Sequence, residues 1–201
     1  MAHIQSFCLY LLIFTNLPSG HFQFTNIAQG TISYRGEHPW QASIRVRGYE
    51  QDYHWCGASI ISRSHVITAA HCLKDYPQSK YLIRVGDCHL DSTDSGENEY
   101  DIEEIHFHEN FNVGPYLNND IAIVKVRSNN SSGMAFGQYV SPVCLPSPNL
   151  NYNGLSNLTI TGWGKIGYDS GVVSKTLQKA EVPIVSTNRC TSSEVCIIDV
   201  V

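Results

Sequence analysis

Short runs of apolar and β-branched residues, separated by polar turns, dominate the first two thirds of the chain. Some runs alternate apolar with polar residues, which is typical of strands with one buried face, and others are continuously apolar, which is typical of strands buried on both faces. No stretch has helical periodicity, and no internal repeat occurs. The pattern predicts six strands, at Gln41–Val46, Ala58–Ile61, Val66–Ala69, Tyr81–Val85, Ile102–Phe107 and Ile121–Val126.

Turn signals between these runs favour a closed antiparallel barrel, which we assign to residues 27–127. Residues 128–150 are rich in Asn, Ser, Gly and Pro and are expected to form a linker between two barrels. The apolar pattern returns with strand-like runs at Leu158–Gly164 and Leu177–Val185.

One apolar run ends abruptly in His71 and Cys72, and Cys56 stands beside another strand-like run upstream. A disulfide could therefore join two buried strands, with a titratable histidine next to it. A lone histidine is more often a core residue with one satisfied nitrogen than a catalytic group. Its meaning depends on what else in the chain could pair with it.

The Thr-Ala-Ala-His-Cys sequence at residues 68–72 resembles the histidine motif of the trypsin/chymotrypsin-like serine proteases. The Asp-Ile-Ala-x-x-Lys sequence at residues 120–125 similarly resembles the aspartate motif of that family. The resemblance implies that His71 is the general base and that Asp120 accepts from one of its ring nitrogens and fixes the tautomer. A buried carboxylate at the mouth of an apolar strand needs such a donor. The family also implies a Cys56–Cys72 disulfide.

Other stretches resemble the same family, so that the similarity covers Ile27 to about Val195. Gly36–Ile44 resembles its first strand, and Leu158–Gly164 resembles the beginning of its second barrel. The resemblance implies an all-β fold, the trypsin-like double antiparallel β-barrel. We expect the first barrel to be complete and the second, in residues 151–201, to be partial.

The Gly-Asp-Ser-Gly-Gly sequence that carries the family's nucleophile does not occur in the 201 residues. Ser170 lies in an Asp-Ser-Gly sequence without the flanking glycines, and we do not expect it to substitute. Loss of a triad member lowers the rate by several orders of magnitude. We therefore expect a trypsin-like serine endopeptidase domain that is inactive as given. The alternatives are a non-catalytic serine protease homologue acting as a binding partner or decoy, and a gene-model fragment of a longer mosaic protease.

Residues 86–100 are strongly acidic. A solvated loop is the simplest interpretation. However, Asp87, Asp94 and Glu97 have the spacings of the carboxylates in the calcium loop of some family members, and such ligands suit this ion. We expect no required cofactor, with calcium as the candidate ion. His106 and His108 are not expected to bind zinc, because no third ligand accompanies them.

Composition constrains the partners and the compartment. The net charge of −5 and the isoelectric point near 5.9 argue against nucleic acid as a partner. Seven cysteines favour an oxidising compartment. The apolar run before residue 20 is too short to span a bilayer and predicts a signal peptide at residues 1–20, followed by a short leader at 21–26. Three N-x-S/T triplets predict glycosylation at Asn129, Asn130 and Asn157.

These features together predict a secreted, extracellular protein without a transmembrane segment. Its expected partners are a protein or peptide substrate, if the domain is completed, and other proteases or inhibitors. The cleavage preference stays open, because in this family it depends on a pocket beyond the matched segment. The pairing states of four further cysteines also stay open, at Cys88, Cys144, Cys190 and Cys196.

Overall fold

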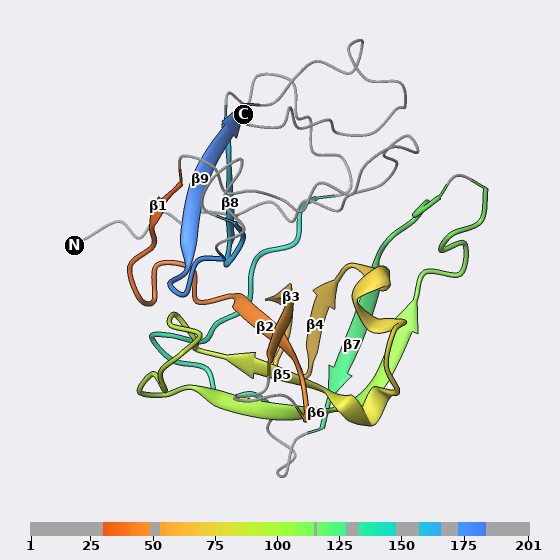
Figure 1. Ribbon diagram of the computed structural model, residues 1–201, viewed down its shortest axis with the longest axis horizontal. Helices are drawn as coiled ribbons and strands as arrows, with labels where there is room; N and C mark the ends of the chain where they lie inside the picture. Colours follow the sequence, from red (N-terminus) through yellow and green to blue (C-terminus); the bar gives the residue numbers. More distant parts are fainter. Residues whose placement is uncertain are drawn as a thin grey trace.

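The computed structural model describes residues 30–48, 53–114, 116–127, 133–147, 157–165 and 173–183. These residues form strands and only two short 3-10 helices, so the all-β prediction is confirmed (Figure 1). The 3-10 helices, η1 (Ala70–Leu73) and η2 (Gln78–Lys80), are too short to leave a periodic pattern in the sequence.

Six strands close into an antiparallel barrel in the order β2-β3-β4-β7-β6-β5. Each strand pairs with two neighbours, so the barrel leaves no open sheet edge. Its interior is filled by a cluster of buried aliphatic residues. The strands are β2 (Gln41–Val46), β3 (Tyr53–Ile60), β4 (His65–Thr68), β5 (Tyr81–Val85), β6 (Asn98–Phe107) and β7 (Ala122–Val126).

All six predicted strands of this barrel are present, but β6 begins earlier than the apolar pattern indicates. Its first residues lie within the acidic stretch, where Arg84 of the neighbouring β5 pairs with Glu99 and Arg47 pairs with Asp101. These cross-strand ion pairs allow acidic residues to continue a strand that hydrophobicity alone would end. The loop in the structure is therefore shorter than the acidic stretch that was predicted to form it, because β6 begins at Asn98.

Strand β2 is buried on both faces. Ala42, Ile44 and Val46 point into the barrel core. The alternate residues are polar and are also buried, on the outer face of the strand: Gln41, Ser43 and Arg45. Each of them bonds to a partner outside its own strand, as described below, which offsets the cost of burying it.

A second, three-stranded antiparallel sheet lies beside the barrel in the order β1-β9-β8 (Figure 1). Its strands are β1 (Thr31–Ile32), β8 (Asn157–Gly162) and β9 (Gln178–Pro183). Polar contacts join it to the barrel: Thr161 Oγ1 donates to Gln41 Oε1 at 2.7 Å, and Lys179 forms an ion pair with Glu37. A closed barrel with a partial second sheet is the trypsin-like arrangement.

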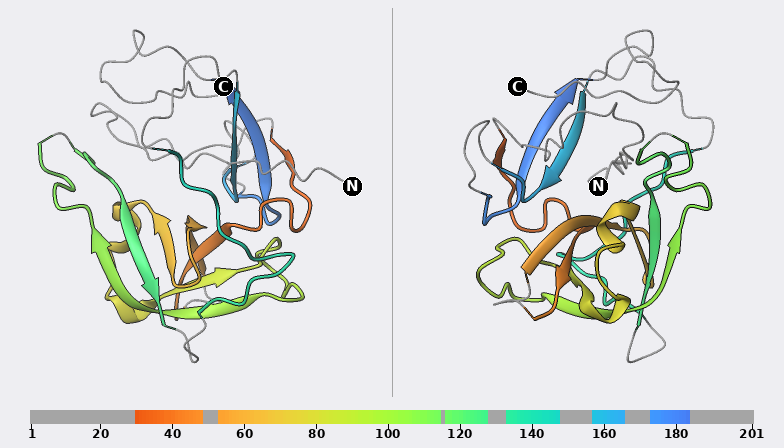
Figure 2. Two further views of the ribbon diagram at one scale, coloured as in Figure 1. Left: turned by 180° about the vertical axis from the view of Figure 1, so that it is seen from behind. Right: turned by 45° about the vertical axis from the view of Figure 1, so that its right-hand side comes forward.

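Residues 133–147, within the predicted linker, run along the barrel toward the second sheet (Figure 2). The segment is packed, because Met134 and Val140 belong to the buried core of the barrel. Its backbone also bonds to the barrel, with the Met134 N–H 2.6 Å from the Arg63 carbonyl and the Val143 N–H 2.8 Å from the Ile60 carbonyl. Within the described part of the chain, no helix has the length and apolar character needed to cross a membrane.

Candidate active site

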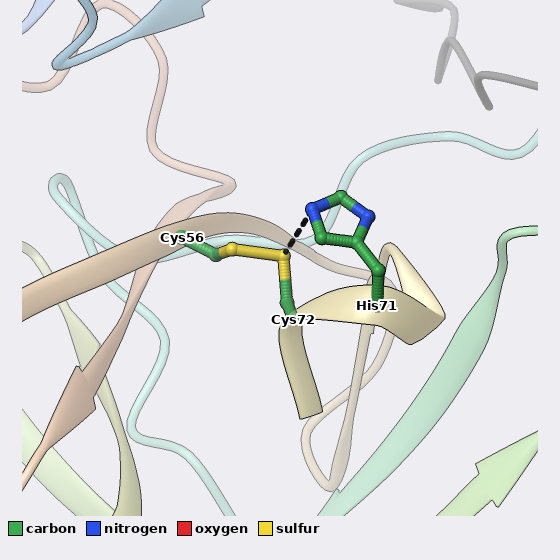
Figure 3. Close-up of side chains that lie close together, drawn as sticks. All are labelled: Cys56, His71 and Cys72. Carbon is green, nitrogen blue, oxygen red and sulfur yellow. Dashed lines mark hydrogen bonds between the residues drawn. A yellow bond between two sulfur atoms is a disulfide. The ribbon is translucent and has the colours of Figure 1, made fainter. Parts of the chain in front are cut away.

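His71 lies on the 3-10 helix η1, directly after strand β4. Ala69 is still extended, and Ala70 is fully buried, so small side chains let the chain turn tightly at the barrel edge. The predicted disulfide between Cys56 of β3 and Cys72 is confirmed, with an S–S distance of 2.01 Å and a Cα–Cα distance of 6.2 Å. It fixes the turn that carries His71 to the neighbouring strand (Figure 3).

Asp120 reaches the same edge from a long loop that ends at β7. The loop has left-handed backbone at Asn112, Leu117 and Asn119, a conformation that asparagine tolerates better than most residues. Asparagine side chains also close it: Asn112 Oδ1 accepts from the Leu117 N–H at 3.0 Å, and Asn118 Nδ2 donates to the Val113 carbonyl at 2.9 Å. The sequence showed a polar turn here but not this network, because side-chain amides pair with atoms that only the folded loop brings near.

The two predicted site residues meet. His71 Nδ1 lies 2.6 Å from Asp120 Oδ2, and the backbone N–H of His71 donates to Asp120 Oδ1 at 2.8 Å. The carboxylate is thus held at both oxygens by one residue. A carboxylate accepts at this distance from Nδ1–H, so a neutral His71 carries its lone pair on Nε2.

The second ring nitrogen of His71, Nε2, is not bonded to the carboxylate. The side chain of His71 is 42% exposed, whereas that of Asp120 is 5% exposed. Nε2 lies 3.5 Å from Cys72 Sγ (Figure 3), but a disulfide sulfur has no proton to donate, so it leaves the lone pair available. The same disulfide removes the two cysteines as thiolate ligands, so this cluster of Cys56, His71 and Cys72 does not form a metal site.

No serine or threonine hydroxyl in the described part of the chain lies within hydrogen-bonding distance of the His71 ring. Ser170 lies outside the described residues, and so do Cys190 and Cys196. Asn129 and Asn130 are outside them as well, and Asn157 is described only as the first residue of β8. Glycosylation at these three positions therefore stays a prediction. Of the other open cysteines, Cys88 is free and buried, and Cys144 is free and exposed.

A buried serine–histidine pair, which the sequence did not reveal, lies between the barrel and the second sheet. Ser43 Oγ is 2.6 Å from His54 Nδ1, and the His54 ring packs edge-on against Trp163. Burial, and then the charge of Arg45, lowers the pKa of His54 to about 3. Ser43 is completely buried, so this pair cannot present a nucleophile to a substrate. Only the pairing of β2 with β3 brings the two residues together.

Asp87, Asp94 and Glu97 do gather, with one ligand atom from each within 4.8 Å of the others. As they stand, however, they do not fit a cation, because each carboxylate is already paired with an arginine. The pairs are Arg45 with Asp87 at 2.5 Å, Arg84 with Glu97 at 3.1 Å and Arg35 with Asp94 at 3.6 Å. The calcium prediction itself stays untested.

The electrostatics of this cluster differ from residue to residue. Burial opposes the charge of Asp94, but N–H donors of Cys88 and His89 outweigh it and hold the pKa of Asp94 below its usual value. At Glu97 burial wins, and the pKa is raised despite the Asp94 N–H and Arg84. The anionic form is therefore stabilised at Asp94 and destabilised at Glu97.

The two histidines that the sequence placed close together lie on the surface and belong to no group of three possible metal ligands among the described residues. His106 Nε2 is 3.1 Å from Glu104 Oε2, and His108 Nδ1 accepts from the Asn110 N–H at 3.1 Å. Both histidines therefore take part in local contacts of a strand end and a turn.

A buried carboxylate that orients a half-exposed histidine, at the edge of a closed barrel stapled by a disulfide, is an arrangement typical of serine proteases. A family model described as Trypsin matches residues 27–199 of the chain. The chain therefore belongs to the trypsin family. Among individual proteins, mouse (Mus musculus) ovochymase-2 is 33% identical over 175 residues, which cover 86% of this chain. The chain spans only 27% of the length of that relative.

Proposed function

We propose that these residues supply the general base and its orienting carboxylate to a trypsin-like serine endopeptidase domain. The observation that carries the proposal is the double contact between His71 and Asp120, at 2.6 and 2.8 Å. In this role His71 Nε2 takes the proton of an attacking serine hydroxyl. Asp120 keeps the ring in the required tautomer and stabilises the imidazolium that forms.

We further propose that a polypeptide of these 201 residues does not hydrolyse peptide bonds. The Gly-Asp-Ser-Gly-Gly sequence is absent from it, and with that sequence go the nucleophile and the backbone donors that stabilise the oxyanion. A base without a nucleophile can bind a proton but cannot form an acyl-enzyme. The presence of both His71 and Asp120 favours a protease ancestry over a barrel long used only for binding, since a buried charge is costly to retain without a role.

The substrates, partners and location proposed for the whole protein follow from the family. Protein or peptide substrates, other proteases or inhibitors as partners, and an extracellular location are all consistent with a disulfide at the centre of the site. No cofactor is required by the chemistry proposed for His71 and Asp120. Expression with residues 1–20 present tests the location: the proposal expects the protein in the medium, with those residues removed.

The test of catalysis uses the purified 201-residue polypeptide and a fluorophosphonate probe, which labels activated serines. We expect no labelling and no turnover of casein or of a mixed peptide library. A second preparation joins residues 1–189 to the C-terminal part of an active trypsin-family domain that carries Gly-Asp-Ser-Gly-Gly. This chimera should be labelled, and His71→Ala should lower its kcat at least about 10³-fold.

Two results would contradict the proposal. The first is turnover by the 201-residue polypeptide itself, and in that case Ser170→Ala identifies or excludes Ser170 as its nucleophile. The second is a chimera whose kcat does not change when His71 is replaced. Asp101→Asn is a control for this test. Asp101 is an exposed strand residue that pairs with Arg47, so its replacement should leave the kcat of the chimera unchanged.

A further inference from the structure

The acidic loop at residues 86–97 lies where the barrel meets the second sheet. The carbonyl of Cys88 accepts two hydrogen bonds from residues that flank the strands of the second sheet. One comes from the Leu177 N–H, just before β9, at 2.9 Å, and one from Trp163 Nε1, just after β8, at 3.2 Å. The Leu90 N–H donates to the Lys175 carbonyl at 2.8 Å. The conformation of this loop therefore sets how the two parts of the molecule join.

The loop is held from inside by ion pairs, of which Arg45–Asp87 is the most buried. Arg45 projects from β2, and the side chains of Arg45 and Asp87 are 2% and 1% exposed. Asp87 cannot exchange this partner for bulk water, because its carboxylate is enclosed by protein. Removal of one member of such a pair leaves an uncompensated charge in the interior.

The remaining carboxylates are neutralised at the edge of the same cluster. Arg84 of β5 lies 3.1 Å from Glu97, and its guanidinium also pairs with Glu99, which ties the end of the loop to the barrel. Arg35 lies 3.6 Å from Asp94. Each of the three carboxylates thus has a guanidinium partner, and Glu97 shares its partner Arg84 with Glu99.

The carboxylate oxygens also accept hydrogen bonds from the backbone of the loop. Glu97 Oε2 accepts from the Asp94 N–H at 3.1 Å, and Asp94 Oδ2 accepts from the Cys88 N–H at 2.7 Å. Asp87 Oδ1 is buried without a hydrogen-bond partner, whereas the other five carboxylate oxygens each contact a hydrogen-bond donor or an arginine. Calcium takes six to eight oxygen ligands, and in the loop as folded each of the three carboxylates is already engaged by an arginine.

We propose that Arg45 and Arg84 take the electrostatic place of a divalent cation in this loop, so that the loop and the junction it forms are stable without calcium. The inference concerns the fold and does not depend on the proposed peptidase role. Its readout is thermal unfolding, so it can fail or succeed independently of any activity.

The experiment compares the unfolding temperature of the chain in millimolar calcium chloride and in EDTA. We expect the same Tm in both. Arg84→Met keeps an unbranched apolar stem but removes the guanidinium, so Glu97, whose pKa burial already raises, loses its arginine partner. This variant should have a lower Tm in EDTA and should recover part of the loss in calcium.

Arg45→Met should show the larger loss of Tm, since Asp87 is fully enclosed, and Arg84→Met keeps the proposal testable if this variant does not fold. Arg47→Met is the matched control: Arg47 directly follows β2, is 43% exposed and pairs with Asp101, outside the cluster. It should gain no response to calcium.

A calcium-dependent rise in the Tm of the unmodified chain would overturn the proposal and support the calcium loop that the family resemblance implies. An Arg84→Met variant with unchanged Tm would also overturn it, because the arginine would then not be neutralising the loop. The same conclusion follows if the variant loses stability and calcium restores none of it.

Discussion

At the scale of single residues, the pair of His71 and Asp120 is asymmetric in a way that suits a proton acceptor. The carboxylate is buried and bound at both oxygens, so it is fixed in place. The imidazole is fixed through Nδ1, its side chain is 42% exposed, and its Nε2 contacts no proton donor among the described residues. One side of the pair therefore provides orientation and the other provides reactivity.

The replacement Asp120→Asn tests this asymmetry. The amide keeps an oxygen for the backbone N–H of His71 but places an NH2 group opposite Nδ1, which cannot accept the ring proton. We expect the hydrogen-bonded Nδ1–H signal of His71 to disappear from the NMR spectrum. The free energy of unfolding should fall by about 1–3 kcal/mol, because a buried hydrogen bond to a charged acceptor is lost.

Asp101→Asn is the control for this experiment, since Asp101 is 48% exposed and lies on β6 away from the site. Its spectrum should keep the Nδ1–H signal of His71. An Asp120→Asn variant with the same ring signals as the unmodified chain would show that the carboxylate does not set the tautomer.

Residue motifs could be predicted here only where both sequence context and residue type are distinctive. His71, Asp120 and the disulfide cysteines follow strand-like runs in sequences typical of a family, so each could be located from the sequence. Ser43 and His54 have no such context. Their pair depends on the register of β2 and β3, and on Trp163 from the second sheet, neither of which hydrophobic pattern determines.

At the scale of elements, the chain between the barrel and the second sheet behaves as part of the barrel core. Its composition predicted a linker, yet Met134 is completely buried and the backbone follows the β3–β4 turn at Arg63. The Asn, Ser, Gly and Pro content of this segment correctly indicates that its backbone is neither helix nor strand. The composition does not reveal which apolar residues of the segment are buried, because two or three such residues form no periodic pattern.

Gly133 is the point where this segment meets the barrel, and it gives a prediction at the same scale. Its φ is +72°, and a Cβ there would lie 2.4 Å from the carbonyl oxygen of Arg63. Gly133→Ala therefore combines left-handed strain with a clash against backbone, next to the buried Met134. We expect the free energy of unfolding to fall by about 2–4 kcal/mol in urea titrations.

Gly114→Ala separates the two contributions to this cost. Gly114 has a φ of +84°, but a Cβ at this position would have no atom within 4 Å, so only the backbone strain applies. Its replacement by alanine should cost about 1 kcal/mol. Equal losses at the two glycines would contradict the packing of the segment against the barrel.

At the scale of the whole molecule, the barrel and the second sheet are joined by polar contacts and by a small buried cluster of Cys88, Trp163 and Leu177. Gln41 bonds to Thr161, Cys88 bonds to Leu177 and Trp163, and Glu37 pairs with Lys179. The barrel could be predicted from its strands, because burying apolar faces determines how they close. The junction could not, because its polar pairs and its small apolar cluster come together only after both sheets have formed.

His54 makes this junction sensitive to acid. Its pKa is about 3 in the folded protein and about 6.5 when unfolded, because burial disfavours the imidazolium. Between these values the unfolded chain binds a proton at His54 and the folded chain does not. Stability from this residue is therefore complete above pH 6.5 and falls as the pH drops toward 3, by at most about 1.4 kcal/mol per pH unit.

Urea unfolding of the unmodified chain and of a Ser43→Ala, His54→Phe double variant between pH 7 and pH 4 measures this share. Replacing both residues leaves neither a titrating ring nor a buried hydroxyl without a partner, and phenylalanine keeps an aromatic contact for Trp163. The double variant should therefore lose stability less steeply as the pH falls. His54→Phe alone should share this shallower slope but be less stable at pH 7 by about 1–3 kcal/mol, because Ser43 then lacks its partner. Parallel pH curves for all three proteins would mean that His54 titrates alike in the folded and unfolded chains, and that the acid sensitivity of the junction has another origin.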